Sequence, residues 1–114
     1  MSVTLLNVDH NDAARYAKSR LLRLAGYQVM EARTGAEALR LTQELRPPLV
    51  LLDVLLPDMD GTEVLRRIRE KHPAIDVIML TGHGSIDTAI EAIRAGAFDY
   101  IAKPCPLGEL EVPL

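Results

Sequence analysis

The residues best suited to chemistry in this sequence stand at the ends of apolar runs. The run LVLLDVLL from Leu49 carries one carboxylate, Asp53, and the turn residues of 57–61 follow it. Such a run is too short for a helix and is typical of a strand buried on both faces of a parallel sheet. A charge is costly there unless it is paired, bound to a metal or placed at the open end of the strand. Asp53 is therefore the first candidate for chemistry.

Other polar residues also end apolar runs: Asp9 and His10 follow VTLLNV, Thr81 follows DVIML, and Lys103 follows FDYIA. Ligands of open α/β sheets bind outside the carboxyl ends of the strands. We therefore expect these side chains to converge with Asp53 on one crevice. Acids, a hydroxyl and an ammonium would then meet at a single site.

The elements that must position these residues alternate along the chain. Apolar runs bounded by turn residues predict strands at about residues 3–8, 28–32, 49–53, 76–80 and 98–102. Helical spacing predicts helices between them. Five alternations of strand and helix indicate an α/β fold with a doubly wound, five-stranded parallel sheet and helices on both faces. A fifth helix begins at Leu107 but is interrupted by Pro113, so we expect it to be truncated or incomplete.

Local patterns refine the helices. Apolar residues recur at helical spacing in the first helix, at Ala14, Ala17, Leu21, Leu24 and Ala25. Thr34 and Glu37 have the spacing of a capping box at the start of the second helix. Asp58 and Asp60 are interpreted as turn formers after the central strand.

Composition narrows the class of protein. The 114 residues suit one domain, and one Phe, three Tyr and no Trp mean that its core is aliphatic. A net charge of −3 without a basic stripe argues against direct contact with nucleic acid. Cys105 is the only cysteine, which excludes an internal disulfide and favours a reducing compartment. No apolar segment is long enough for a membrane span, so we expect a soluble, cytoplasmic protein without a membrane partner.

The ordered set of polar residues resembles the receiver domain of bacterial two-component response regulators over nearly the whole chain. The residues that carry the resemblance are Asp9 with His10, Asp53, the turn 57–61, Thr81, and Lys103 with Pro104. Residues 81–104 look most like receivers attached to enhancer-binding, ATP-dependent transcription activators. The resemblance implies a flavodoxin-like receiver fold, with residues 1–114 as the amino-terminal part of a longer protein.

The resemblance also implies a function. Asp53 would take a phosphoryl group from a sensor histidine kinase and switch an output surface in order to regulate transcription. The domain is not expected to be an enzyme beyond self-phosphorylation from small phosphodonors and autodephosphorylation. Its partners would be the kinase and an attached or separate output domain, and the family allows a homodimer.

The resemblance assigns roles within the site. Mg²⁺ would be held by Asp9, Asp53 and the backbone carbonyl of Leu55, because this hard ion takes oxygen ligands. Lys103 would balance the charge of the phosphoryl oxygens and Thr81 would donate a hydrogen bond to one of them. Thr81 and Tyr100 would form the switch, although Tyr100 equally suits a partly buried core position.

His10 departs from the family pattern, which usually has a second acid there as a direct metal ligand. Neutral imidazole is a poor ligand for Mg²⁺, and a protonated one repels it. His10 would weaken metal binding, shift preference toward softer ions such as Mn²⁺, or leave coordination to Asp12. Asp12 itself is better explained as a residue of the first helical turn.

Leu55 and His83 occupy positions that, in the family, flank the path of the water that hydrolyses the phosphoryl group. Leu55 cannot orient a water molecule, so a phosphoryl group on Asp53 is expected to be long-lived.

Three other functions could belong to a chain with this fold. A pseudo-receiver would be an interaction module with the same fold and a metal site impaired by His10. A flavodoxin-like cofactor binder is disfavoured because no phosphate-cradling Gly-rich loop follows the first strand. A haloacid-type phosphatase is disfavoured because Leu55 stands where its second catalytic Asp would be expected.

Overall fold

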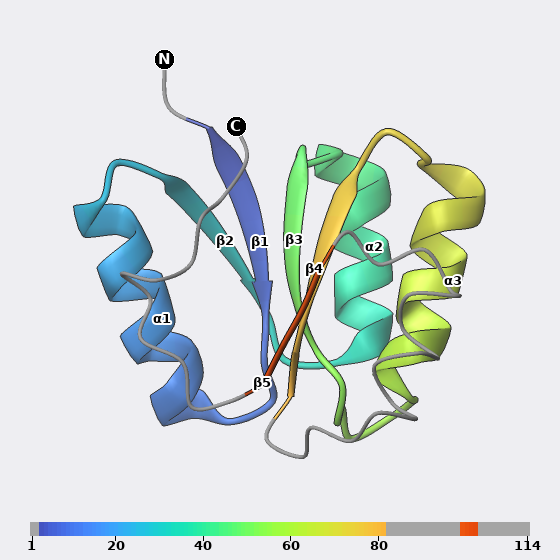
Figure 1. Cartoon of the computed structure of the whole chain (residues 1–114), viewed down its shortest axis with the longest axis horizontal. Helices are drawn as coiled ribbons and strands as arrows, with labels where there is room; N and C mark the ends of the chain where they lie inside the picture. Colours follow the sequence, from blue (N-terminus) through green and yellow to red (C-terminus); the bar gives the residue numbers. More distant parts are fainter. Residues whose placement is uncertain (1–2, 82–98, 103–114) are drawn as a thin grey trace.

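The computed structural model describes residues 3–81 and 99–102, with side chains described up to residue 80. The elements in these ranges are β1 (Thr4–Val8), α1 (Asp12–Leu24), β2 (Gln28–Ala32), α2 (Gly35–Leu45), β3 (Leu49–Asp53), α3 (Gly61–Lys71), β4 (Asp76–Thr81) and β5 (Asp99–Ala102). Strands and helices alternate as predicted (Figure 1). The helix expected between β4 and β5 and the incomplete fifth helix lie outside the described residues.

The five strands form one parallel sheet in the order β2-β1-β3-β4-β5. This order confirms the prediction of a doubly wound parallel sheet. Val8 of β1 pairs with Leu52 of β3, and Asp53 of β3 pairs with Leu80 of β4. Asp9 and Asp53 each follow one member of the Val8–Leu52 pair. The register therefore brings both acids to the same edge of the sheet.

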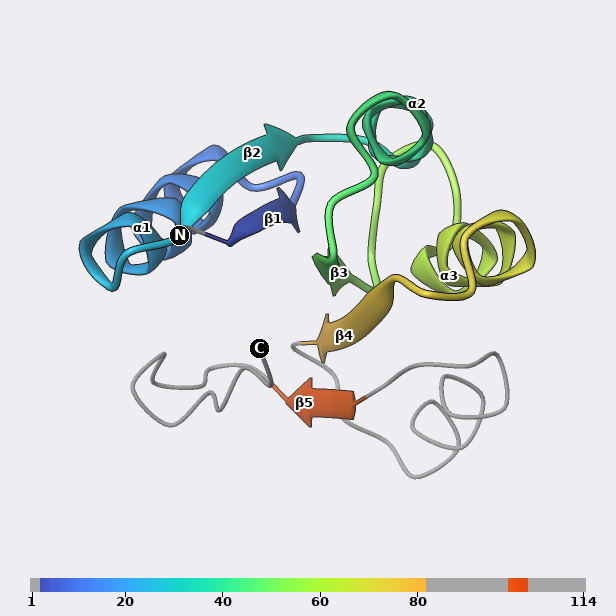
Figure 2. The same cartoon turned by 90° about the horizontal axis from the view of Figure 1, so that it is seen from above.

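Alternate residues of the central strands pack on opposite faces of the sheet. One face carries Leu6, Val8, Val50 and Leu52 and packs with residues of α2 and α3 such as Ala38 and Ile68. The other face carries Leu5, Val29, Leu49, Leu51, Ile78 and Leu80 and packs with Leu22 of α1. Figure 2 shows α1 apart from α2 and α3, which lie together. The buried side chains of these two apolar clusters are aliphatic apart from Met79, as the composition predicts.

Polar side chains mark the starts of the helices. The Asn11 side chain accepts a hydrogen bond from the Ala14 amide at 2.8 Å and caps α1. The Thr34 hydroxyl accepts one from the Glu37 amide at 3.1 Å, which confirms the predicted cap of α2. Each cap satisfies an amide that a helix start would otherwise leave without a partner.

The face that α1 turns to the sheet differs from the prediction. Leu21 and Leu24 are 52% and 76% exposed, whereas Ser19 and Leu22 are buried. The helix is turned because polar groups of β1 hold it. The Asn7 amide donates hydrogen bonds to the Ser19 hydroxyl at 3.0 Å and to the Arg15 carbonyl at 3.1 Å.

None of the helices in the described ranges has both the length and the apolar character needed to cross a membrane.

Gly61 lets α3 begin directly beneath the end of β3. A Cβ at this position would overlap the Asp53 carbonyl oxygen and would lie 2.7 Å from the Val54 Cα. These atoms are backbone and cannot move aside cheaply. At Gly35, the first residue of α2, a Cβ would instead meet the side chains of Met59 and Val64.

We predict that Gly61→Ala lowers the free energy of unfolding by about 2 kcal/mol or more, the scale of overpacking. Gly35→Ala is the matched control, since it also places alanine at the first residue of a helix but meets movable side chains. Urea denaturation measures both. Equal losses for the two variants would contradict the backbone explanation.

Candidate functional site

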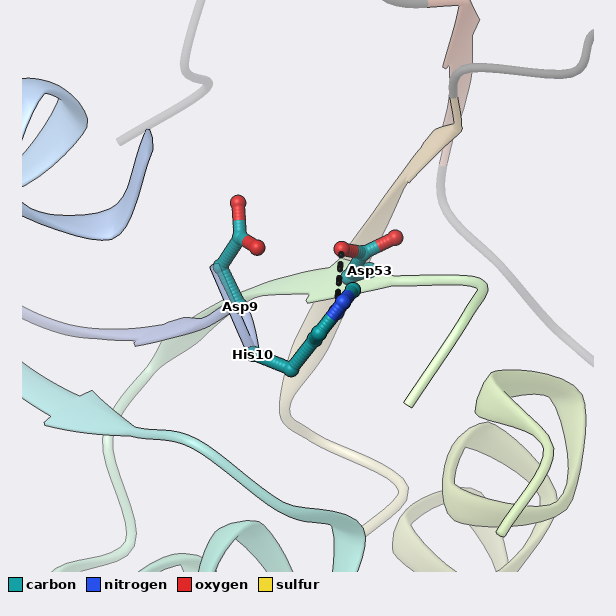
Figure 3. A group of neighbouring side chains, drawn as sticks. All are labelled: Asp9, His10 and Asp53. Carbon is teal, nitrogen blue, oxygen red and sulfur yellow. Dashed lines mark ion pairs between the residues drawn. The ribbon is translucent and has the colours of Figure 1, made fainter. Parts of the chain in front are cut away.

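Two buried carboxylates and one imidazole meet at the carboxyl edge of the sheet (Figure 3). Asp9 follows β1 and is fully buried, Asp53 ends β3 and is 5% exposed, and His10 is exposed. The side-chain ligand atoms of the three residues all lie within 4.8 Å of one another. The predicted convergence of Asp9, His10 and Asp53 is confirmed.

The Asp53 carboxylate lies between a backbone amide and the imidazole of His10. Its Oδ1 accepts a hydrogen bond from the Leu55 amide at 3.2 Å, and its Oδ2 lies 3.8 Å from the His10 Nδ1. The second distance is too long for a hydrogen bond but lets a protonated imidazole attract the carboxylate. The side chain of Leu55 is apolar and 55% exposed.

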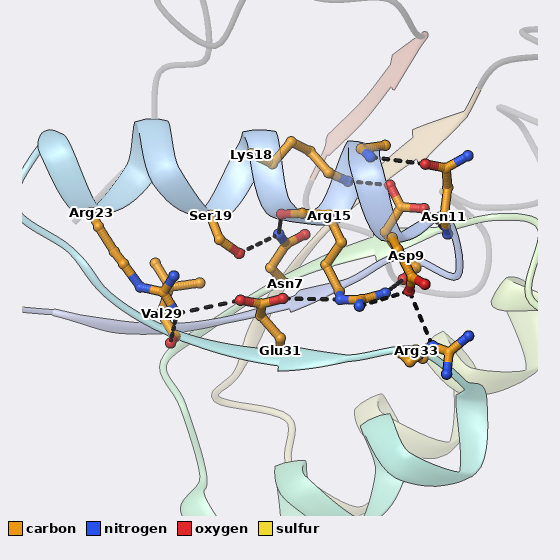
Figure 4. Close-up of polar contacts among 12 residues, drawn as sticks. Asn7, Asp9, Asn11, Arg15, Lys18, Ser19, Arg23, Val29, Glu31 and Arg33 are labelled. Atoms are coloured by element: carbon orange, nitrogen blue, oxygen red, sulfur yellow. Dashed lines mark hydrogen bonds and ion pairs between the residues drawn. The ribbon is translucent and has the colours of Figure 1, made fainter.

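Asp9 has a different set of neighbours (Figure 4). Its Oδ1 accepts a hydrogen bond from the Asn11 amide at 3.0 Å, and its Oδ2 lies 2.9 Å from the ammonium of Lys18. Its carbonyl oxygen accepts a hydrogen bond from Arg15 at 2.9 Å. Sequence reasoning missed Lys18, because a lysine within a polar helix is usually solvated and no local signal turns it toward the sheet.

Arg15 ties the loop after β1 to its surroundings. Its guanidinium pairs with Glu31 of β2 at 2.9 Å and with Asp12 at 2.8 Å. Partial burial alone would lower the pKa of Arg15, but the hydrogen bonds to Asp12 and Glu31 outweigh it and raise this pKa. The hydrogen bond from Arg15, together with the charge of Arg33, lowers the pKa of Asp12. Asp12 thus lies in the first turn of α1, as predicted, and serves these arginines.

The loop after β3 is tied to two helices. The Asp58 carboxylate accepts hydrogen bonds from the amides of Gly35 at 2.7 Å and Ala36 at 2.9 Å, at the start of α2. Asp60 caps α3 by accepting from the Thr62 amide at 3.1 Å. Both aspartates were predicted as turn formers, and the structure adds these capping roles. The sequence could not reveal the Asp58 contact, because it joins residues 23 positions apart.

The donor set suits a divalent cation only in part. The carboxylates of Asp9 and Asp53 are hard oxygen ligands of the kind that Mg²⁺ takes, and their ligand oxygen atoms lie within 4.8 Å of one another. The imidazole of His10 is a softer ligand that suits Mn²⁺ better than Mg²⁺. The residues present therefore fit a cation, with weaker preference for Mg²⁺ than three acids would give.

Two more predicted site residues belong to the strands beyond β3. Thr81 ends β4 and pairs with Ala102 of β5, while Tyr100 of β5 pairs with Met79. The end of β4 lies beside the end of β3, and β5 follows β4 in the sheet. The side chains of Thr81 and Tyr100, and all of Lys103, Pro104 and His83, lie outside the description.

Comparison with known proteins matches residues 5–113 to the response regulator receiver domain. The chain belongs to this family. This match confirms the resemblance to response regulator receiver domains that the sequence indicated.

Curated relatives include regulators of transcription. This receiver domain is 38% identical over 108 residues to the regulatory protein AtoC of Escherichia coli, covering 95% of this chain and 23% of AtoC. It is 36% identical over 102 residues to the DNA-binding transcriptional regulator NtrC of Escherichia coli, covering 90% of this chain and 22% of NtrC. The chain therefore spans about a quarter of the length of these relatives.

A solved structure supports the fold. A response regulator protein from Burkholderia pseudomallei, crystallised with a phosphorylated aspartic acid, a calcium ion and citrate, is 29% identical and superposes with a TM-score of 0.89. The match covers 94% of this receiver domain and 63% of that chain.

Asp58 generates a prediction about stability and pH. The amides of Ala36 and Gly35 lower the pKa of Asp58 below its ordinary value of 3.8. The stabilisation is therefore fully present above pH 3.8 and is lost as the pH falls through the lowered value. We expect Asp58→Ala to cost about 1 kcal/mol at pH 7, the scale of a lost helix cap.

Urea denaturation of the wild type and Asp58→Ala across the pH range gives the test. The difference between them should stay constant at neutral pH and narrow in acid. Asp58→Asn, which keeps one acceptor oxygen without the charge, should lie between the two. A difference that persists unchanged into acid would refute the charged cap.

Proposed function

We propose that this receiver domain accepts a phosphoryl group on Asp53 and passes a signal by changing its output surface. The observation that supports the proposal is the placement of the Asp53 carboxylate, buried at the end of a central strand beside Asp9 and His10. The Burkholderia pseudomallei relative contains a phosphorylated aspartic acid and a calcium ion, which adds support from the family.

The geometry around Asp53 suggests which oxygen reacts. Oδ1 is held by the Leu55 amide, whereas Oδ2 lies toward His10 at the mouth of the site. In the proposed step, a bond forms between Oδ2 and phosphorus while the phosphorus–nitrogen bond of a phosphohistidine breaks, and the released imidazole takes a proton. The Leu55 amide orients the carboxylate for this attack.

Charge is the obstacle to this step, because two anions must approach one another. When bound, a divalent cation would supply a compensating positive charge at Asp9, Asp53 and the Leu55 carbonyl. Lys103 would add a further positive charge and Thr81 a hydrogen bond to a phosphoryl oxygen. The roles of Lys103, Thr81 and the Tyr100 switch stay predictions carried over from the family.

The wider role follows from the relatives. AtoC and NtrC are about four times longer than the matched region, and NtrC is a DNA-binding transcriptional regulator. We propose a regulatory rather than catalytic role for residues 1–114, as the amino-terminal receiver of a longer cytoplasmic protein. Its partners would be a histidine kinase, an output domain that regulates transcription, and in some states a second copy.

One observation favours a second candidate, a pseudo-receiver that binds partners without phosphorylation. His10 stands beside Asp53, and Lys18 already neutralises Asp9. Both features reduce the attraction of the site for a divalent cation. The following experiment separates the two functions.

Incubation with Mg²⁺ and a small phosphodonor, followed by intact-mass analysis, tests phosphorylation directly. We expect one phosphoryl adduct in the wild type and none in Asp53→Asn, which lacks the nucleophilic oxygen. Absence of the adduct with Mg²⁺ and Mn²⁺, also in His10→Asp, would support the pseudo-receiver instead.

The structure also predicts how long a phosphoryl group would stay on Asp53. The exposed Leu55 side chain offers no hydrogen bond to a hydrolytic water, so the phosphoryl group should decay slowly. Leu55→Asn should shorten the lifetime by about tenfold, which is less than the roughly hundredfold or greater effect of a general base, because an amide can orient a water molecule but cannot take its proton. A decay time course by mass analysis measures both proteins. An equal or slower loss of the phosphoryl group from Leu55→Asn would contradict this explanation of its lifetime.

A further inference from the structure

Lys18 places its side-chain ammonium beside Asp9, in the site that Asp9, His10 and Asp53 form. Its Nζ is buried and lies 2.9 Å from the Asp9 Oδ2, and only 13% of its side chain is exposed (Figure 4). The partner carboxylate is also shielded, with 1% of its side chain exposed. Burying either charge alone is costly, so the ammonium and the carboxylate stabilise one another at this position.

The pair changes what Asp9 offers to a metal. Oδ1 accepts the Asn11 amide at 3.0 Å and Oδ2 faces the ammonium. A cation on Oδ2 would lie next to a positive charge that the protein itself supplies. Among the described residues of the site, two carboxylates face one ammonium and one imidazole. Affinity for a divalent cation falls as the negative charge of the ligand set falls.

We infer that Lys18 is a resident cation of this site, which competes with divalent metal for Asp9 and sets a weak metal affinity. A bound divalent ion must displace the ammonium from Oδ2 or share that oxygen with it. Lys18 is thus a residue that determines metal affinity through its contact with Asp9. The inference rests on the metal site of the proposed function.

Direct binding of Mn²⁺, followed by the electron paramagnetic resonance signal of the free ion, tests this inference without any phosphorylation. Lys18→Met keeps the length of the side chain but removes its charge. We expect its dissociation constant for Mn²⁺ to fall about tenfold or more, because a repulsive charge next to the ion is gone. Arg20→Met is the matched control, since it removes one positive charge from an exposed residue of the same helix. Its constant should stay within about twofold of the wild type.

A second measurement uses the wild type and does not depend on how the variants fold. The chain has three lysines, Lys18, Lys71 and Lys103, so their ammonium nitrogens can be resolved by nuclear magnetic resonance with ¹⁵N-labelled lysine. Addition of Mg²⁺ should shift the Lys18 signal, while that of the exposed Lys71 stays in place. An unshifted Lys18 signal at saturating Mg²⁺, or equal Mn²⁺ affinity in Lys18→Met and the wild type, would overturn the inference.

The outcomes also separate this inference from the proposed function. Tighter Mn²⁺ binding by Lys18→Met without any phosphoryl adduct on Asp53 would support the resident cation and refute the phosphoacceptor. An adduct on Asp53 with unchanged Mn²⁺ binding in Lys18→Met would support the phosphoacceptor and refute the resident cation.

Discussion

The rest of the structure depends on how the negative charges of two neighbouring carboxylates are stabilised at the end of an apolar sheet. Asp9 and Asp53 are buried within 4.8 Å of one another and of the His10 imidazole. Like charges repel, and low polarity makes each charge more costly. The Asn11 and Leu55 amides and the Lys18 ammonium contact the pair, and each offsets part of this cost.

The same demand explains how α1 packs. A helix on a sheet normally buries an apolar stripe, but α1 turns Arg15, Lys18 and Ser19 toward the sheet. These residues bind the Asp9 carbonyl, the Asp9 carboxylate and the Asn7 amide respectively. Leu21 and Leu24 are exposed as a result. The orientation of the first helix therefore serves the site as well as the core.

The other side of the site is held by the loop that follows β3. Asp58 binds the start of α2, Asp60 caps α3, and Gly61 brings α3 against the backbone of Asp53 and Val54. These contacts join the loop to two helices that pack on the same face of the sheet. Asp53 is thus followed by a segment that hydrogen bonds and packing hold in place, which suits a residue whose reacting oxygen must keep its position.

The sequence by itself determined the fold class, the strands and the meeting of Asp9, His10 and Asp53. Apolar periodicity reports local structure, and parallel strands bring their carboxyl ends to one edge of the sheet. Only the tertiary structure decided that Lys18 reaches Asp9 and that Asp58 caps α2. These contacts depend on the rotation of a helix and the path of a loop, which follow from the packing of the whole domain and leave no local pattern.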